Sequence, residues 1–554
     1  MTTGKSLKGI LWEIPGGKPG WSERSVVIPS AGSGEVARYA NQEGHEVYVA
    51  DLNCAKGSLP NRIENGFSLF YERTSQKKPD FFMLTGMTCK ADNNARFAEY
   101  LKARNPNIPI IMGGTHISGI RGGIEMAALE GVYDEGAIYA LDRLAKAGVD
   151  FLYAGESINI GELLTFISEG KLGRNLEKIK GVSYREHGKW VHNQKHADAT
   201  LEVSREVAFK ESPMWERYLF GFAKTHLWGM GPAFPFRISK GCDYNCDFCS
   251  AKTVNPNKSL KIHIRHTPLD FEHSLSEFEN LLRMGAEFIF FTDEDPLQKD
   301  SSGYSHGRKF LKEITRRGLA KNVKLGMMTS GRATADKEEV AIMKDANVVM
   351  AMTGYESLTN PKGVGKTGFN PEEGFQSIEN LADAGIMNLD GAIVGGFDDD
   401  KDSIINELTL RAKLGLGVTL VQPLEPYFGT ETRIKAIEEK LIRNNGRENN
   451  GYGGFGGMHG EMIASLATRK GLEPLDVTEA IVSALRRNQR QILKNVFTGP
   501  YLKHVPTHLV SRAIRFIPQI PEAIKESRMS DRELAEKRIK EVIEYNQLDF
   551  EITK

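Results

Sequence analysis

The chain contains 554 residues, of which 40% are hydrophobic and 26% are charged, the usual balance of a folded globular protein. This composition excludes a disordered chain, a collagen and a small disulfide-stabilised scaffold, and the length corresponds to roughly three to four domains, or to two with an appendage. With 72 basic and 72 acidic residues the net charge is zero, which disfavours a general nucleic-acid-binding protein. No apolar stretch reaches the ~18 residues of a membrane span, and the N-terminal segment lacks a signal-peptide core. We therefore expect a cytoplasmic protein that neither spans a membrane nor binds nucleic acid.

Short apolar segments alternate with helical patterns from the start of the chain. Strands are predicted at Lys8–Ile14, Glu46–Asp51, Asp80–Thr85, Ile108–Met112 and Val149–Ala154. Helices are predicted between them at Gly34–Glu43, Asn61–Thr74 and Asn93–Arg104. Because these strands are apolar on both faces, the alternation indicates a parallel sheet covered by helices on both sides. In such doubly wound domains, ligands bind at the carboxyl ends of the strands.

A hairpin and an aromatic connector follow. Ile179–Val191 is predicted to form two strands that turn at Glu186–Gly188. Pro213–Phe236 is rich in aromatic residues, and we expect it to pack between two domains.

From Phe236 the strand–helix alternation resumes. Six strands are predicted at Phe236–Ser239, Glu287–Thr292, Val323–Thr329, Val348–Thr353, Asn388–Val394 and Val418–Pro423. Helical patterns separate them, among them Phe271–Met284 and Pro371–Ala384, and glycine follows several helices, as at Gly285, Gly318 and Gly385. Six consecutive strand–helix units predict an open barrel rather than a closed eight-stranded one.

The last part of the chain is polar and then helical. Asn444–Gly460 is glycine-rich, typical of a flexible linker or a mobile lid, and the tail from Glu461 has helical patterns broken by prolines. The predicted fold is therefore α/β: a doubly wound, Rossmann-like N-terminal domain, a partial (β/α)6 barrel and a mainly α-helical C-terminal region. The predicted boundaries are 1–200, a connector 201–235, 236–440 and 441–554.

Three of the five cysteines lie within eight residues, at Cys242, Cys246 and Cys249. This C-x3-C-x2-C spacing lets three thiolates converge on one metal site from a single loop, and soft thiolates select zinc, copper(I) or iron–sulfur clusters. The remaining two, Cys54 and Cys89, have the pattern of small buried hydrophobic residues.

A zinc site is the first interpretation of this cluster, because His263 and His266 follow the cysteines. However, the histidines are closer together than in a Cys2His2 finger, and a third cysteine is left over. The residues that follow also begin a long amphipathic helix, whereas a finger is a small free-standing unit. A zinc-stabilised binding protein without catalytic activity remains the alternative from a different class.

An iron–sulfur cluster explains the odd number of cysteines. A cubane cluster usually takes four cysteine ligands. With three, one iron keeps an open site at which a substrate or cofactor can chelate.

The cysteine motif, with Phe248 just before Cys249 at the mouth of a strand–helix barrel, resembles the signature of the radical S-adenosylmethionine (SAM) enzymes. Four later segments also resemble that family: Phe291–Asp295, Gly354–Ser357, Gly391–Gly396 and Glu425–Thr430. The resemblance implies a [4Fe–4S] cluster on the three cysteines, whose open iron binds the amino and carboxylate groups of SAM. It also implies reductive cleavage of SAM to a 5′-deoxyadenosyl radical, driven by an external reductant of the flavodoxin or ferredoxin type.

The same resemblance assigns eight residues to SAM. Two acidic residues after the second barrel strand would meet the methionine amino group, three later residues would bind polar parts, and a glycine pair would let the adenine lie against the backbone. In chain order the eight are Phe248, Asp293, Glu294, Arg332, Glu356, Ser357, Gly395 and Gly396. The alternative for each carboxylate is a strand-end residue bonded to a helix terminus or a lysine.

A second motif, Gly363–Thr367, suggests a phosphate-binding loop. The glycine that this loop requires five residues before Gly365 is replaced by Asn360, and we therefore reject a nucleotide site here.

A doubly wound domain before such a barrel resembles the cobalamin-binding subfamily. Gly113–His116 and Asp150–Glu156 match its Gly-Gly-x-His and hydrophobic-Gly-Glu patterns. The implied cobalamin contacts are Thr85, Gly86, Met87, Thr88, Gly113, Gly114, His116, Gly155 and Glu156. A domain without cofactor, or with another nucleotide, is the alternative, because fold alone does not fix the ligand.

One departure concerns the cobalt ligand. Many cobalamin proteins supply an axial histidine from an Asp-x-His-x-x-Gly motif, and none of the 13 histidines lies in one. We predict that no protein histidine binds cobalt, that Met87 or Thr88 lies nearest its lower face, and that His116 contacts the corrin edge or packs structurally.

The resemblance as a whole implies a cobalamin-dependent radical SAM methyltransferase. It would move a methyl group from SAM, through methylcobalamin, to an unactivated carbon or a phosphinate phosphorus of a small-molecule, natural-product or peptide substrate. An enzyme that keeps both cofactors but closes or rearranges a ring, or oxidises its substrate, is the alternative.

Overall fold

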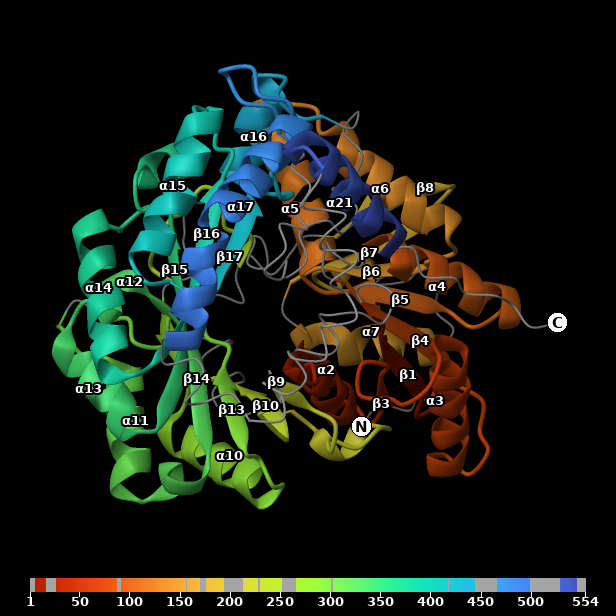
Figure 1. The fold of residues 1–554 in the computed structure, drawn as a ribbon. Helices are drawn as coiled ribbons and strands as arrows, with labels where there is room; N and C mark the ends of the chain where they lie inside the picture. The colour runs from red at the N-terminus through yellow and green to blue at the C-terminus, as the bar shows by residue number, and fades with distance from the viewer. Residues whose placement is uncertain are drawn as a thin grey trace.

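The computed structural model describes residues 5–15, 26–86, 91–155, 157–169, 176–193, 213–227, 230–251, 266–299, 302–416, 418–443, 466–498 and 529–545. Figure 1 shows two α/β halves that face each other, the N-terminal half in red to orange and the barrel in green to cyan. Blue helices from the C-terminal part pack on the barrel half.

The N-terminal half is built on one seven-stranded sheet. Its strand order is β3 (Glu46–Asp51), β1 (Lys8–Glu13), β4 (Phe81–Thr85), β5 (Ile110–Gly113), β6 (Phe151–Tyr153), β7 (Val182–Glu186) and β8 (Lys189–His192). The first five strands are parallel, and the predicted hairpin β7–β8 is confirmed as an antiparallel extension at one edge. The order reverses beside β1, so the ligand-binding crevice of a doubly wound sheet falls there.

Helices cover both faces of this sheet, as the apolar strands predict. On β1, Leu11 joins the core on one face, whereas Ile10 and Trp12 join the core on the other. The first face packs against α2 (Ala31–Gln42) and α7 (Ile160–Ser168), and the second against α3 (Leu59–Arg73), α4 (Ala91–Arg104), α5 (Thr115–Glu130) and α6 (Glu135–Lys146). Helix α2 begins three residues before its predicted start, because the Ser30 hydroxyl accepts the backbone N–H of Ser33 and caps the helix at Ala31.

The second half is the predicted open barrel. Its six parallel strands run in order β10 (Ala233–Phe236), β13 (Phe288–Phe291), β14 (Lys324–Ser330), β15 (Val348–Glu356), β16 (Met387–Val394) and β17 (Val418–Pro423). Its helices cover the outer face in Figure 1: α10 (Phe271–Arg283), α11 (His306–Arg316), α12 (Gly331–Thr334), α13 (Lys337–Asp345), α14 (Pro371–Ala384) and α15 (Lys401–Lys413).

The predicted position of the first barrel strand was wrong by three residues. The strand is Ala233–Phe236 and includes Pro235, which is tolerated because β10 is an edge strand. Ser239–Lys240 instead forms β11, a short antiparallel pair with β12 (Thr267–Pro268). A second short pair joins β2 (Val26–Val27) to β9 (His226–Leu227).

The aromatic connector packs between the halves, as expected. Trp215 lies 5.7 Å from Phe234 between ring centroids, and its indole N–H donates to Glu277 on α10 at 2.8 Å. On the other side, the backbone N–H of Leu219 donates to the carbonyl of Val49 on β3 at 2.8 Å. The connector therefore continues the core of one half into that of the other.

Helix α16 (Glu431–Glu438) follows the last barrel strand. Beyond it, the described C-terminal part is mainly helical, with α17 (Pro474–Thr498) and α21 (Asp531–Tyr545). Apolar residues of α17, among them Val477 and Ile481, pack against α15 and the strands β16 and β17. The glycine-rich stretch 444–460 lies outside the described residues. Every helix that the structure describes is too short or too polar to cross a bilayer.

Candidate active site

A cavity of ≈ 800 Å³ lies between the two halves, where the carboxyl ends of both sheets meet. The N-terminal half contributes Gly32, Glu35, Gly114, Thr115, Ser118, Gly155 and Ser157 to its wall. The barrel contributes the three clustered cysteines together with residues in the carboxyl-terminal part of its strands or after them. Both sets of strand ends therefore face one shared space.

The loop that carries the cysteines is fixed by hydrogen bonds to its backbone. The N–H of Gly241 donates to Glu294 at 3.2 Å and that of Asp243 to Gln298 at 3.2 Å. These acceptors follow β13, so the loop is held against the neighbouring strand end.

The three thiols lie where an iron–sulfur cluster could be held. Cys242, Cys246 and Cys249 all line the cavity. A cubane cluster takes one cysteine thiolate per iron, so three thiols on one wall can hold three of its irons. Burial raises the pKa of the Cys242 thiol to about 12, and a metal that binds it must displace the proton. His266, which the zinc interpretation needs, is described, whereas His263 is not.

The segment Gly363–Thr367, which we rejected as a phosphate-binding loop, packs against the cysteine loop. The hydroxyl of Thr367 accepts from the N–H of Asn245 at 2.9 Å and lies 3.7 Å from the Cys246 sulfur. The carbonyl of Gly365 accepts from the N–H of Asp247 at 2.9 Å. Gly365 has a φ of +75°, and a Cβ there would lie 2.7 Å from the Cβ of Asp247. Gly365 thus serves close packing against the cysteine loop.

This contact gives a prediction for Gly365→Ala. The added methyl group would push the cysteine loop away, and we expect iron content after reconstitution to fall at least about twofold, with a larger loss of SAM cleavage. Gly385→Ala is the matched control, because Gly385 has a φ of +73° and open space around its Cβ position. It should cost about 1 kcal/mol of stability and leave the iron content unchanged. Equal iron content in both variants would contradict the packing role.

Glu356, one of the predicted SAM residues, lines the cavity. It ends β15 with a φ of +60°, at a shift in the register with β16. Its carboxylate lies over Gly354, where a Cβ would be 2.7 Å from Oε1, and over Gly391, where it would be 3.6 Å from Oε2. Only a glycine at position 354 leaves room for it. Lys366 lies 3.5 Å from the same Oε1.

Lys366 brings a positive charge into the cavity beside the cysteines. Its side chain is largely buried, which disfavours the charged form, but the charges of Glu356 and the cysteines outweigh burial and raise the pKa of Lys366. The ammonium therefore stays protonated and can meet an anionic group of a ligand.

Several predicted SAM residues lie elsewhere. Glu294 and Phe248 line the cavity, but Asp293 does not. Asp293 is fully buried and accepts the N–H of Ile238 at 3.0 Å, and burial raises its pKa to about 7. Asp293 therefore holds the chain just before the cysteine loop. Arg332 is exposed and lies 3.7 Å from Glu373.

Ser357 and the glycine pair are also outside the cavity wall. The Ser357 hydroxyl donates to Glu407 at 3.2 Å. A Cβ on Gly395 would meet Val477 of α17, and one on Gly396 would meet the carbonyl of Gly363. Their role in binding SAM stays a prediction that these contacts do not support.

In the N-terminal half, Gly114 and Gly155 line the cavity. Gly114 has a φ of +99°, and a Cβ there would lie 2.7 Å from the carbonyl oxygen of Gly86. Gly113 bonds to Gly86 through its carbonyl at 2.9 Å. The strand ends after β4 and β5 are thus pressed together, which brings Thr85 to the same edge.

His116 lies just behind this edge. It is 1% exposed, and its ring packs 5.9 Å from that of Phe428, between centroids. This position agrees with one of the two roles predicted for His116, structural packing. A contact between His116 and the corrin edge stays a prediction. Met87, Thr88, Cys89 and Glu156 lie outside the described residues, whereas Cys54 is buried in the apolar core, as predicted.

Sequence reasoning missed the charged residues that join the halves. Arg433 on α16 donates to both carboxylate oxygens of Asp134, which caps α6, at 2.6 and 2.7 Å. Both side chains are almost fully buried, and the guanidinium lies 4.1 Å from the ring centre of Phe428. At the cavity itself, Arg237 pairs with Glu35 across the two halves. These pairs have no local sequence signal, because their partners are far apart in the chain.

Comparisons with known families agree with both halves of this site. The model of the B12 binding domain matches residues 22–145, and that of the radical SAM superfamily matches residues 236–408. The chain is a cobalamin-dependent radical SAM enzyme. As such, it uses a [4Fe–4S] cluster, SAM and cobalamin, and the glycine edges and the three thiols of the shared cavity fit these groups.

One protein of similar sequence and two solved structures resemble this radical SAM enzyme. An uncharacterised methyltransferase of Pyrococcus horikoshii, PH0819, is 24% identical over 66% of this chain and 71% of its own. The radical SAM methyltransferase TsrM of Kitasatospora setae superposes with a TM-score of 0.59 at 16% identity, covering 84% of this chain and 81% of that one. OxsB, solved with aqua-cobalamin and SAM bound, superposes with a TM-score of 0.57 at 15% identity, covering 97% and 80%. At these identities the two structures show the fold.

Proposed function

We propose that this enzyme transfers a methyl group from SAM, by way of cobalamin, to an unactivated carbon or a phosphinate phosphorus of a small-molecule, natural-product or peptide substrate. The single observation that carries the proposal is the shared cavity, whose wall holds the three thiols on one side and the glycine edge of the N-terminal sheet on the other. Methyl transfer needs two reactive groups that face one substrate. PH0819 and TsrM, both named as methyltransferases, support this choice.

When bound, the reduced cluster supplies the electron that cleaves SAM, and cobalamin carries the methyl group. Cys242, Cys246 and Cys249 would hold three irons and leave the fourth for SAM. Glu356 and Glu294 offer carboxylates for the amino group of SAM, and Lys366 offers an ammonium for its carboxylate. The Lys366–Glu356 distance of 3.5 Å keeps these opposite charges side by side, as the two groups of an amino acid require.

The rest of the wall excludes water. Phe248, Met328, Met352, Leu420 and Tyr427 line the cavity, and apolar walls protect a reactive intermediate from solvent. On the other side, Gly114 and Gly155 leave the backbone bare, so a flat macrocycle can approach it closely. An external one-electron donor of the flavodoxin or ferredoxin type would reduce the cluster.

The test uses anaerobically reconstituted enzyme with cobalamin, a chemical reductant and methyl-labelled SAM. We expect label to appear in the corrin fraction, and 5′-deoxyadenosine to form. Candidate substrates are then screened for a product heavier by one methylene. If 5′-deoxyadenosine forms while the corrin never carries label, ring closure or oxidation replaces methyl transfer. Intact SAM under all conditions would contradict the proposal entirely.

A further inference from the structure

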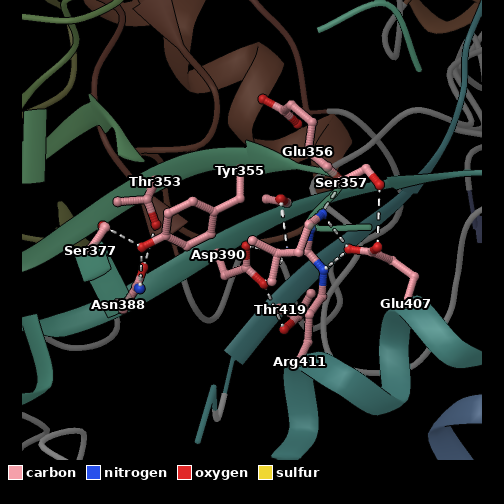
Figure 2. A network of polar contacts seen from close by, with 12 residues as sticks. Thr353, Tyr355, Glu356, Ser357, Ser377, Asn388, Asp390, Glu407, Arg411 and Thr419 are labelled. Atoms are coloured by element: carbon pink, nitrogen blue, oxygen red, sulfur yellow. Dashed lines mark hydrogen bonds and ion pairs between the residues drawn. The ribbon is translucent and has the colours of Figure 1, made fainter. Parts of the chain in front are cut away.

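A buried network of charges lies beneath the Glu356 end of the cavity, around Arg411 of α15 (Figure 2). Arg411 forms ion pairs with Asp390 on β16 and with Glu407 one turn earlier on its own helix, the latter at 2.9 Å. All three side chains are nearly inaccessible to solvent. None of them lines the cavity.

The remaining donors of Arg411 are aimed at the backbone of the cavity wall. Its guanidinium donates to the carbonyl of Glu356 at 3.0 Å and to that of Gly391 at 3.2 Å. These residues lie on neighbouring strands beside the register shift of β15 and β16. A single side chain therefore ties together the two strand ends over which the Glu356 carboxylate lies.

Glu407 fixes the chain immediately after Glu356. Its carboxylate accepts the N–H of Leu358 at 2.8 Å and that of Thr359 at 2.9 Å, together with the Ser357 hydroxyl. Figure 2 shows the consequence: Ser357 points toward Glu407, whereas Glu356 points away from the network. The side chains of Glu356 and Ser357 thus lie on opposite sides of the end of β15.

Stability alone does not account for this arrangement. Replacing a buried ion network by apolar residues is often neutral or stabilising, because removing charges from water is costly. The left-handed backbone at Glu356, with a φ of +60°, is itself unfavourable for a non-glycine residue and persists only where its surroundings enforce it. The network supplies that constraint through the Glu356 carbonyl and the two N–H groups that follow.

We propose that Arg411 is a positioning residue for SAM, which acts by holding the Glu356 carboxylate in the cavity. This inference rests on the proposed function, because it takes Glu356 as a ligand of SAM. Without the guanidinium, the strand end can relax to ordinary backbone angles, and the carboxylate then leaves its place above Gly354 and Gly391. Cluster assembly and cobalamin binding involve other elements and stay unaffected.

The test measures SAM binding to the reconstituted holoenzyme, by equilibrium dialysis and by the change in the electron paramagnetic resonance signal of the reduced cluster when SAM is added. Arg411→Lys keeps the charge but loses the fork that spans two carboxylates and two carbonyls. We expect its Kd for SAM to rise at least about tenfold, with iron and cobalt contents unchanged. Arg121→Lys is the matched control, because Arg121 is equally buried but donates to the carbonyl of Asn193 in the N-terminal half; it should bind SAM normally.

A double-mutant cycle separates positioning from a general loss of stability. If Arg411 acts through Glu356, then Glu356→Ala weakens SAM binding, and adding Arg411→Lys to it produces no further loss. Should Arg411→Lys fail to fold, Glu407→Gln replaces it, with a smaller loss of affinity expected in the same direction.

The outcomes distinguish the inference from the proposed function. Normal SAM binding by Arg411→Lys, an equal loss in Arg121→Lys, or full additivity with Glu356→Ala would each overturn the positioning role. A wild-type enzyme that binds no SAM would instead overturn the proposed function, on which the inference depends.

Discussion

Replacing Cys246 by alanine is expected to abolish cluster assembly and SAM cleavage. Cys246 is the most buried of the three thiols, at 6% exposed, and its sulfur lies against Thr367. Only two cysteine ligands would remain, too few to hold a cubane cluster that already lacks a fourth. We expect 5′-deoxyadenosine formation to fall at least about 1,000-fold, with little iron and sulfide bound after reconstitution.

Cys54→Ala provides the matched control. Cys54 is also a buried free thiol, but it lies in the core of the N-terminal half, and burial raises its pKa far above the ordinary value. Its loss should cost about 1 kcal/mol of stability, as expected for a small core deletion, while the iron content and SAM cleavage stay at wild-type levels. A Cys246→Ala enzyme that retains a full cluster would refute the assignment of the motif.

Asp134→Asn is expected to separate SAM cleavage from the proposed methyl transfer. Asparagine can still cap α6, but it leaves the Arg433 guanidinium buried without its ion pair, and breaking a buried pair in this way costs about 3–5 kcal/mol. Because that pair joins α6 of the N-terminal half to α16, the cofactor sites would lose their fixed separation. We expect SAM cleavage to change less than about threefold, while methyl transfer falls at least about tenfold.

The comparison variant here is Asp336→Asn. Asp336 also caps a helix, α13, and pairs with a lysine, Lys299, but both partners are partly exposed. Exposed pairs contribute about 0–1 kcal/mol, so neither activity should change. Parallel loss of SAM cleavage and methyl transfer in Asp134→Asn would mean that the pair supports folding in general, not the spacing of the halves.

Regular elements could be predicted from sequence where local signals agree. The strands Glu46–Asp51 and Val418–Pro423 and the helix Pro371–Ala384 have the predicted bounds. In the helix, Asn370 caps the start, proline follows, and Gly385 adopts the left-handed conformation at the end. The residues next to each boundary are therefore enough to predict where the helix begins and ends.

The site was predictable only in part, because a motif does not say which way each of its residues faces. Glu294 reaches the cavity while its neighbour Asp293 is buried beneath the cysteine loop. Both residues follow β13, so one contiguous motif after a strand contains both a wall residue and a structural one. Ser357 likewise differs from Glu356, because its hydroxyl donates to the buried Glu407.

Contacts between residues far apart in the chain were not predicted from the sequence. Asp134 and Arg433 are 299 positions apart, and Lys366 belongs to a loop whose glycines suggested a different ligand. Only the folded chain brings that loop against Cys246. Such contacts depend on the packing of whole elements, which leaves no periodic trace in the sequence.

The most direct test of the account is the metal content of the chain, purified anaerobically with cobalamin supplied and reconstituted with iron and sulfide. Iron, sulfide, cobalt and zinc are counted per chain. The account predicts about four irons, about four sulfides and about one cobalt. Zinc without iron would contradict it, and iron without cobalt would remove cobalamin from the cavity between the two halves.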